Sequence, residues 1–245
     1  MRLSWVAASI FALLVAAVPA TANSPVQVYY MPLPEEEVLA AFQALDTGAS
    51  PLDGDTTIRT VLSITVTQTD TILYYDQWEN DFERQITAPD NLYSAGNPGG
   101  TQIWGDGDSS NGAPPGIPGD VLTAGDVITL DNQVPSSPRD PANFFFDGGD
   151  KLAAVWPVAV TRAAWPVPDT GTVIAGAVEV IPTRDWDTSY QAPGGENLAV
   201  SCTTTDGTDD QADYCMFQDS RLLIMAQLDD TEVTVDIDND GTAEI

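Results

Sequence analysis

Hydrophobic and polar residues alternate with a period of two over several short segments of the chain, which is the pattern of half-buried β-strands. In residues 61–67 the apolar Leu62, Ile64 and Val66 alternate with hydroxyl-bearing residues. A turn signal at 69–71 precedes a second apolar segment at 72–75, so the sequence predicts a hairpin over residues 61–75. Further strands are expected at residues 153–161, 172–180, 222–226 and 231–237.

One segment near the N-terminus has a helical period instead. Pro34 and the glutamates at 35–37 come first, an arrangement typical of the first turn of a helix. Apolar residues at 38, 39, 42 and 45 then fall on one face, and Gly48 is a stop signal. We therefore expect one short helix that Pro34 and the three glutamates open.

Residues 87–150 are rich in glycine, proline and aspartate, and we interpret them as a loop-rich excursion with one or two strands, such as 127–130. Trp104 and the three phenylalanines at 144–146 within it are expected to be buried. Short strands between Gly, Pro and Asp turns indicate an all-β fold, an antiparallel β-sandwich or a jelly-roll-like domain. Long loops and one N-terminal helix complete the predicted fold.

The first 22 residues have the features of a secretory signal peptide. Arg2 precedes an apolar segment at 3–18, and Ala20-Thr21-Ala22 provides small residues for cleavage. We expect residues 23–245 to form a single secreted or cell-surface domain that is not inserted in the membrane after cleavage. Because a new strand is due after Asn239-Asp240-Gly241, we also expect the chain to be truncated at its C-terminus, with further domains beyond.

The composition limits the chemistry that the domain can perform. It has 37 acidic and 8 basic residues, a formal charge of −29, and such a surface repels nucleic acid and attracts cations. The chain has no histidine, which excludes Ser-His-Asp and Cys-His catalysis and His-ligated zinc. Cys202 and Cys215 are its only cysteines, and in an exported protein they predict a disulfide.

Acidic loops are the candidate calcium ligands. Residues 236–241 match the start of a calcium loop, DxDxDG, whose carboxylates would be Asp236, Asp238 and Asp240. The alternative is a plain hairpin turn at 239–241. Asp106 and Asp108 lie in a second Asp- and Gly-rich loop, and residues 147–150 form a third; each of these is equally consistent with an ordinary turn. Calcium is therefore the cofactor that we expect.

The segment at 74–79 combines aromatic residues with two carboxylates, Asp76 and Glu79. It is compatible with a glycosidase acid and nucleophile, but the simpler interpretation puts the aromatics in the core and the carboxylates on the surface. Exposed aromatics, such as Tyr93 or Trp104, are the contacts that a glycan-binding module would use. Arg162 lies in an apolar segment, and we expect it to pair with a buried carboxylate.

Six segments together resemble the N-terminal region of large secreted bacterial and fungal surface proteins, which is distantly similar to the IgG Fc-binding protein N-terminal domain. They are YYDQWEND at 74–81, IWGDGDSSNG at 103–112, DVLTAGDVITL at 120–130, RDPANFFFDGGD at 139–150, PVAVTRAAWP at 157–166 and AGAVEV at 175–180. The resemblance covers most of the chain from Pro32 onward and implies an extracellular β-domain without established catalytic residues. Such relatives would have Gly and Tyr within the segment where this chain has Asn80-Asp81-Phe82.

The sequence therefore predicts a non-catalytic extracellular module for adhesion or for envelope or matrix interaction, stabilised by calcium. Its partner would be an extracellular protein or a glycan. The alternatives are a secreted glycan-active hydrolase that uses a carboxylate pair, and a carbohydrate-binding module.

Overall fold

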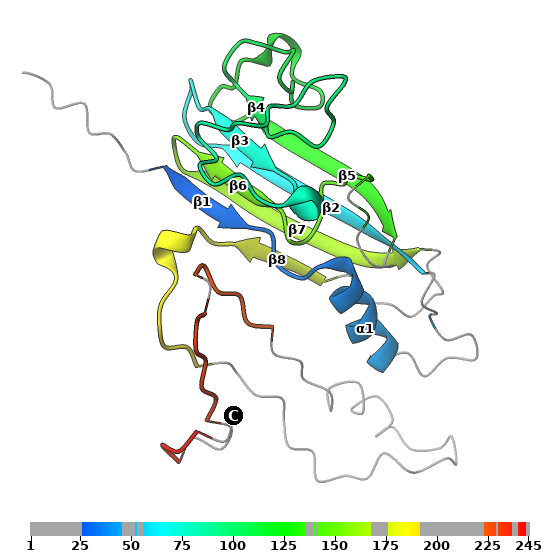
Figure 1. Cartoon of the computed structure of the whole chain (residues 1–245), viewed down its shortest axis with the longest axis vertical. Coiled ribbons are helices and arrows are strands. Elements are labelled where there is room, and N and C mark those ends of the chain that lie inside the picture. The colour runs from blue at the N-terminus through cyan, green and yellow to red at the C-terminus, as the bar shows by residue number, and fades with distance from the viewer. Residues whose placement is uncertain are drawn as a thin grey trace, which may run out of the picture.

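Eight strands pair into two four-stranded antiparallel sheets that pack as a sandwich (Figure 1). The computed structural model describes residues 26–45, 52, 56–135, 140, 142–167, 176–191, 223–228, 230–236 and 240–243. One sheet has the order β1-β6-β3-β4 and the other β5-β2-β7-β8. The strands are β1 (Gln27–Tyr30), β2 (Thr57–Val66), β3 (Leu73–Asp76), β4 (Gln102–Trp104), β5 (Val127–Pro135), β6 (Lys151–Ala154), β7 (Val158–Val167) and β8 (Gly176–Val180). The predicted all-β fold is confirmed.

The core lies between the two sheets, and each of the eight strands contributes to it. In β2 the alternation seen in the sequence places Leu62, Ile64 and Val66 inside, each at most 1% exposed. Burying an aliphatic side chain of this size contributes about 1.5–3 kcal/mol relative to leaving it in water. The period of two therefore decides which face of each strand turns inward.

Trp104 is in this core, as the sequence predicts, whereas the three phenylalanines at 144–146 are half-buried and Phe146 packs against the core. Trp104 is fully buried at the end of β4, and its ring stacks on Tyr75 with a centroid distance of 5.3 Å. Phe146 packs edge-on against Tyr75 at 5.1 Å. Residues 87–150 consist largely of loops, but they contain two strands, β4 and β5. These two strands attach the segment to the two sheets of the sandwich.

The predicted hairpin over residues 61–75 is wrong. β2 pairs with β5 and β7, whereas β3 pairs with β4 and β6, so the connection crosses from one sheet to the other. Asp70, with a positive φ of 61°, lies in this crossing, and its amide donates to the Leu122 carbonyl at 3.0 Å. Apolar alternation fixes the inward face of a strand but not its partner, and β5 and β7 offer β2 much longer ladders than β3 would.

Three other strand predictions need correction. The segment 153–161 is two strands in different sheets, β6 and β7, because the chain crosses over at 155–157, where Pro157 has no amide to pair. The described parts of the strands predicted at 222–226 and 231–237, residues 223–226 and 231–236, belong to neither sheet. The strand predicted at 172–180 is present as β8 (Gly176–Val180). Its predicted residues before 176 lie outside the described part of the chain.

The predicted helix is present as α1 (Glu35–Leu45), and a buried ion pair holds its first residue against the sandwich. Arg162 of β7 binds Glu35 with an N–O distance of 2.5 Å, and both side chains are 2% exposed. Glu35 also accepts hydrogen bonds from the Thr60 hydroxyl and the Gly148 amide. The expectation that Arg162 pairs with a buried carboxylate is therefore confirmed.

The helix and the longest loops lie at opposite ends of the sandwich (Figure 1). α1 lies near the start of β2, where Val38, Leu39, Ile58 and Ala164 form a second, smaller core. The loop that runs from β4 to β5 lies at the end of β2, where the Val66 amide donates to the Asp126 carbonyl. Among the described residues, no helix has both the length and the apolar character needed to cross a membrane.

Candidate functional site

The loop between β4 and β5 brings Asp106 to a second carboxylate, Asp120, that the sequence analysis did not select. Asp120 ends the short 3-10 turn η2 (Pro118–Asp120) and is fully buried. Its Oδ1 accepts the Gly105 amide at 2.8 Å, and its carbonyl accepts the Gly107 amide at 2.9 Å. Gly105 and Gly107 have φ values of 92° and 85°, which glycine adopts without strain. These bonds hold the loop segment around Asp106 against Asp120.

Asp106 and Asp120 influence each other's ionisation. Burial raises the pKa of Asp120, against the effect of the Gly105 amide, and the neighbouring Asp106 raises it further. Burial also acts to raise the pKa of Asp106, but hydrogen bonds from Asn111, the Asp108 amide and Asp120 together lower it. A protonated Asp120 donates to Asp106, whereas two ionised carboxylates leave the Asp120 Oδ2 without a hydrogen-bond partner. The pair therefore favours either a proton or a cation between its oxygens.

Asp108, also predicted as a ligand, is fully exposed and shapes the loop. Its Oδ1 accepts hydrogen bonds from the Ser110 amide at 3.0 Å and the Ser110 hydroxyl at 2.6 Å. These two bonds lower the pKa of Asp108, so its carboxylate is ionised and engaged within its own turn. The structure thus brings Asp106 together with Asp120 rather than directing all the predicted carboxylates at one point.

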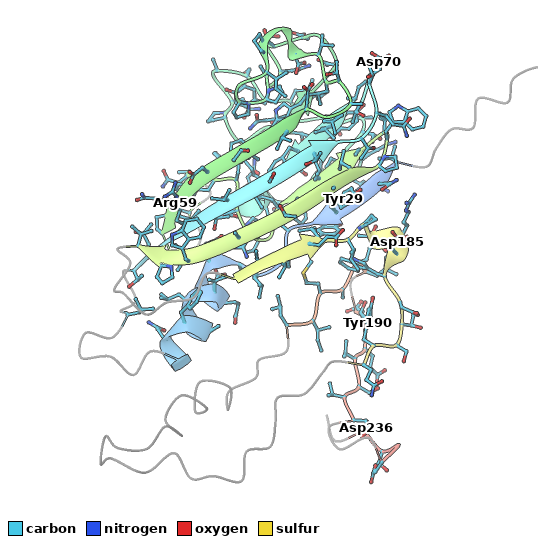
Figure 2. All side chains as sticks on the ribbon, turned by 180° about the vertical axis from the view of Figure 1, so that it is seen from behind. Tyr29, Arg59, Asp70, Asp185, Tyr190 and Asp236 are labelled. Carbon is cyan, nitrogen blue, oxygen red and sulfur yellow. The ribbon has the colours of Figure 1, made fainter. Side chains whose placement is uncertain are left out.

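The predicted C-terminal calcium loop lies at the far end of the molecule. Asp236 accepts the amides of Asp240 at 3.2 Å and Gly241 at 2.8 Å, and Asp240 accepts the amide of Thr242 at 2.7 Å. These bonds fit both a calcium loop and the plain turn that was the alternative. Figure 2 shows Asp70, whose crossing lies beside the β4–β5 loop, at one end and Asp236 at the other. The two predicted groups of ligands therefore do not form one site.

Two predictions fall wholly or partly outside the described residues. The predicted calcium ligand Asp238, the middle carboxylate of the C-terminal loop, lies outside them. So does the predicted disulfide between Cys202 and Cys215. Within the described ranges, no three His, Cys, Asp or Glu side chains lie close enough together to hold a metal ion. Calcium at these positions stays a prediction.

The third acidic loop, residues 147–150, is part of the core. Asp147 and Asp150 are buried, and Asp150 accepts the Tyr75 hydroxyl at 2.6 Å and the Asp147 amide at 2.9 Å. Asp147 accepts the Trp78 indole nitrogen at 3.3 Å. Burial and the Asp150 carboxylate raise the pKa of Tyr75 well above its usual value, so this hydroxyl remains a donor. The loop ties β3 to β6.

The carboxylates of Asp76 and Glu79 have different surroundings. The simpler interpretation from the sequence put the aromatic residues in the core and both carboxylates on the surface, and only its first half fits the structure. Tyr75 is in the core, but Asp76 is not on the surface: it is 2% exposed. Its two oxygens accept the Glu83 amide at 2.7 Å and the Thr101 hydroxyl at 3.0 Å. Burial raises the pKa of Asp76 in spite of these bonds and of Lys151 nearby. Glu79 accepts the Phe145 amide at 3.2 Å. Both carboxylates thus hold backbone segments in place.

An aromatic cluster lies on the outer side of the β1-β6-β3-β4 sheet, and we call Tyr30, Phe82, Trp186 and Lys151 the aromatic face. Tyr30 and Lys151 are register partners on β1 and β6, and Asp76 continues the row on β3. The Lys151 ammonium lies 5.8 Å from the Tyr30 ring and 5.5 Å from the Phe82 ring. Trp186 lies 6.2 Å from Tyr30. Four separate segments therefore meet there.

The aromatic face replaces the aromatic residues chosen from the sequence. Trp104 has no exposed surface and Tyr93 is half-buried, whereas Phe82 is 38% exposed. Tyr30, Phe82 and Trp186 are far apart in the sequence, and only Tyr30 lies in a strand, so the fold as a whole brings them together. Asp120 was missed for a similar reason: a turn in the chain, not a short motif, brings it to Asp106.

Comparisons of the chain with protein-family models, with curated proteins and with solved structures find no match.

Proposed function

We propose that this chain is a non-catalytic recognition module of a secreted or cell-surface protein, used for adhesion or for envelope or matrix interaction and stabilised by calcium. The signal peptide predicted at residues 1–22 and the resemblance to large secreted surface proteins support export. A β-sandwich suits this role because its sheets form a rigid support for an exposed face.

The observation that carries the proposal is the aromatic face. Phe82 exposes 38% of its surface, and Ile181, whose carbonyl accepts the Trp186 indole N–H, is 46% exposed. Aromatic rings supply a large contact area at a small cost in conformational entropy, and they are enriched where proteins bind their partners. Lys151, one of the 8 basic residues of the chain, adds a hydrogen-bond donor between the rings.

The alternative of a hydrolase acting through Asp76 and Glu79 has less support. A catalytic acid must reach the substrate, but Asp76 is 2% exposed and uses both oxygens on Glu83 and Thr101. If the chain is nevertheless a hydrolase of this kind, Asp76→Asn will abolish turnover of a glycan substrate while leaving the fold intact.

A second candidate, a carbohydrate-binding module, has the same aromatic face in its favour. Aromatic rings stack on the apolar faces of sugars, and Lys151 would donate to sugar hydroxyls. This candidate differs from protein adhesion in its ligand, not in its site, so one experiment separates the two.

The test measures binding of the fluorescently labelled chain to insoluble polysaccharides and to immobilised extracellular-matrix proteins. We expect one of these classes to retain the wild-type chain, and Phe82→Ala or Trp186→Ala to weaken that retention. Val127→Thr is the matched control, because Val127 is 50% exposed on the other sheet. Circular dichroism checks that each variant is folded. Equal retention of all variants would rule out the aromatic face as the binding surface.

A further inference from the structure

The loop from β4 to β5 contains two buried oxygen atoms without a donor, and both belong to residues beside Asp106. One is the Asp120 Oδ2, in a fully buried side chain, which has no partner when Asp106 and Asp120 are both ionised. The other is the Asn111 Oδ1, whose amide group donates through Nδ2 to the Asp106 Oδ2 at 2.8 Å. A buried oxygen without a partner costs on the order of 1–3 kcal/mol, so two of them around one carboxylate require an explanation.

A bound cation would satisfy the Asp120 Oδ2 directly, and the Asn111 oxygen once the Asn111 amide has turned over. Among the described ion pairs, which join Arg59 to Asp131, Arg162 to Glu35 and Arg184 to Asp185, none includes Asp106 or Asp120. A half-turn of the Asn111 amide about its last bond, which is a two-fold torsion, would bring its oxygen towards Asp106. Three side chains would then direct oxygen atoms at one point.

We propose that Asp106, Asn111 and Asp120 bind one calcium ion. All the donors are oxygen atoms. Such a set favours a hard cation such as calcium over zinc or copper. Asp106 is exposed, so water can complete the six to eight oxygen ligands that calcium takes. We leave Asp108 out of this set because its side chain is exposed, its Oδ1 accepts two hydrogen bonds from Ser110, and neither of the two buried oxygens without a donor belongs to it.

This proposal rests on the proposed function, which includes stabilisation by calcium. It gives that calcium ion a location and a structural role. Asp120 binds the Gly105 amide, and Gly105 directly follows the buried Trp104. An ion at Asp120 would therefore tie residues 105–111 to the end of β4. The loops at this end of the sandwich would become more rigid, while the aromatic face would remain unchanged.

The experiment is isothermal titration of the purified chain with calcium chloride at fixed ionic strength, with magnesium chloride as the comparison. We expect Asp120→Asn to weaken calcium binding by about tenfold or more, since it removes a charged ligand. Asp108→Asn, with the same change of charge in the same loop, should leave affinity nearly unchanged. Terbium luminescence excited through tryptophan provides a second signal, because Trp104 is adjacent to the loop.

Asn111→Asp keeps the test decisive if Asp120→Asn does not fold. A third carboxylate tightens calcium binding if the ion lies between these residues, and it only adds repulsion if no ion binds there. Tighter binding would support the proposal, and an unchanged or weaker affinity would overturn it.

The remaining outcomes separate this site from the calcium of the proposed function. If the wild-type chain binds no calcium, both are wrong. If it binds calcium and Asp236→Asn abolishes binding while Asp120→Asn does not, the ion lies in the C-terminal loop and only the present proposal fails.

Discussion

At the scale of single residues, Asp81 has a backbone conformation that suits glycine. It follows the 3-10 turn η1 (Trp78–Asn80) with φ 71° and ψ 148°, a region in which a Cβ atom is strained. We predict that Asp81→Gly stabilises the protein by about 1 kcal/mol, the strain relieved exceeding the entropy that glycine adds to the unfolded chain. Urea unfolding measures this difference.

The control is Asp90→Gly. Asp90 is exposed in the following loop and is not among the residues with positive φ. Glycine there only increases the freedom of the unfolded chain, so this variant should be slightly destabilised. Destabilisation of both variants would mean that Asp81 is not strained.

The buried carboxyl of Asp76 predicts a pH dependence of stability. Its folded pKa is raised above the ordinary value of 3.8, mainly by burial, so the folded state holds this proton more tightly than the unfolded state. The contribution of Asp76 to stability is therefore complete below pH 3.8 and is lost as pH rises through the folded pKa. The free energy of unfolding of the wild type relative to Asp76→Asn should fall over that range.

For Asp108 the contribution to stability should change with pH in the opposite direction. Hydrogen bonds from Ser110 lower its pKa, so its contribution is present above the ordinary value and is lost as pH falls through the folded pKa. The wild type should thus gain stability relative to Asp108→Asn as pH rises. Urea unfolding at a series of pH values tests both, and slopes of the same sign for the two variants would contradict this assignment.

At the scale of elements, the buried ion pair of Glu35 and Arg162 decides how α1 is attached to the sheet. Both side chains are 2% exposed, and Glu35 also binds Thr60 of β2 and the Gly148 amide. Arg162→Met would leave the Glu35 charge buried and unpaired. We predict a loss of about 3–5 kcal/mol in the free energy of unfolding, because a buried charge without its partner is costly.

Two further variants test the cause of that loss. Combining Arg162→Met with Glu35→Gln removes both charges, so it should recover a large part of the lost stability. Arg59→Met breaks an exposed pair with Asp131, in which both side chains are 43% exposed, and it should cost only a small fraction as much. Chemical denaturation of all three variants provides the comparison; a double variant as unstable as Arg162→Met would show that packing, not charge, causes the loss.

The elements also show how far local patterns in the sequence reach. The helix begins at Glu35, as proline and the acidic first turn indicate, and the alternation in residues 61–67 correctly gives the buried face of β2. The partner of each strand could not be predicted, because pairing depends on contacts between distant segments. For this reason the local pattern predicts a hairpin after Val66 and a continuous strand through Ala154, where the chain in fact crosses between the sheets. The same limit applies to the meeting of Asp106 with Asp120.

At the scale of the whole molecule, charge is the property that the sequence gives most directly. The chain has 37 acidic and 8 basic residues and a formal charge of −29, so the folded state carries strong self-repulsion. Dissolved salt screens this repulsion, with a Debye length that falls from about 30 Å at 0.01 M to about 10 Å at 0.1 M. We therefore predict that the melting temperature rises over this range of sodium chloride, measured in chelator.

Screening must be separated from calcium binding and from effects of particular anions. Sodium chloride and sodium sulfate at equal ionic strength should raise the melting temperature equally, since screening depends on ionic strength alone. Calcium at the same ionic strength should add a further rise, because an ion that binds only the folded state stabilises it by mass action. That further rise should disappear in Asp120→Asn, whereas the effect of sodium salts should remain. A melting temperature that does not change with sodium salts would mean that the acidic residues lie too far apart to repel, and the excess charge would then act on solubility and not on stability.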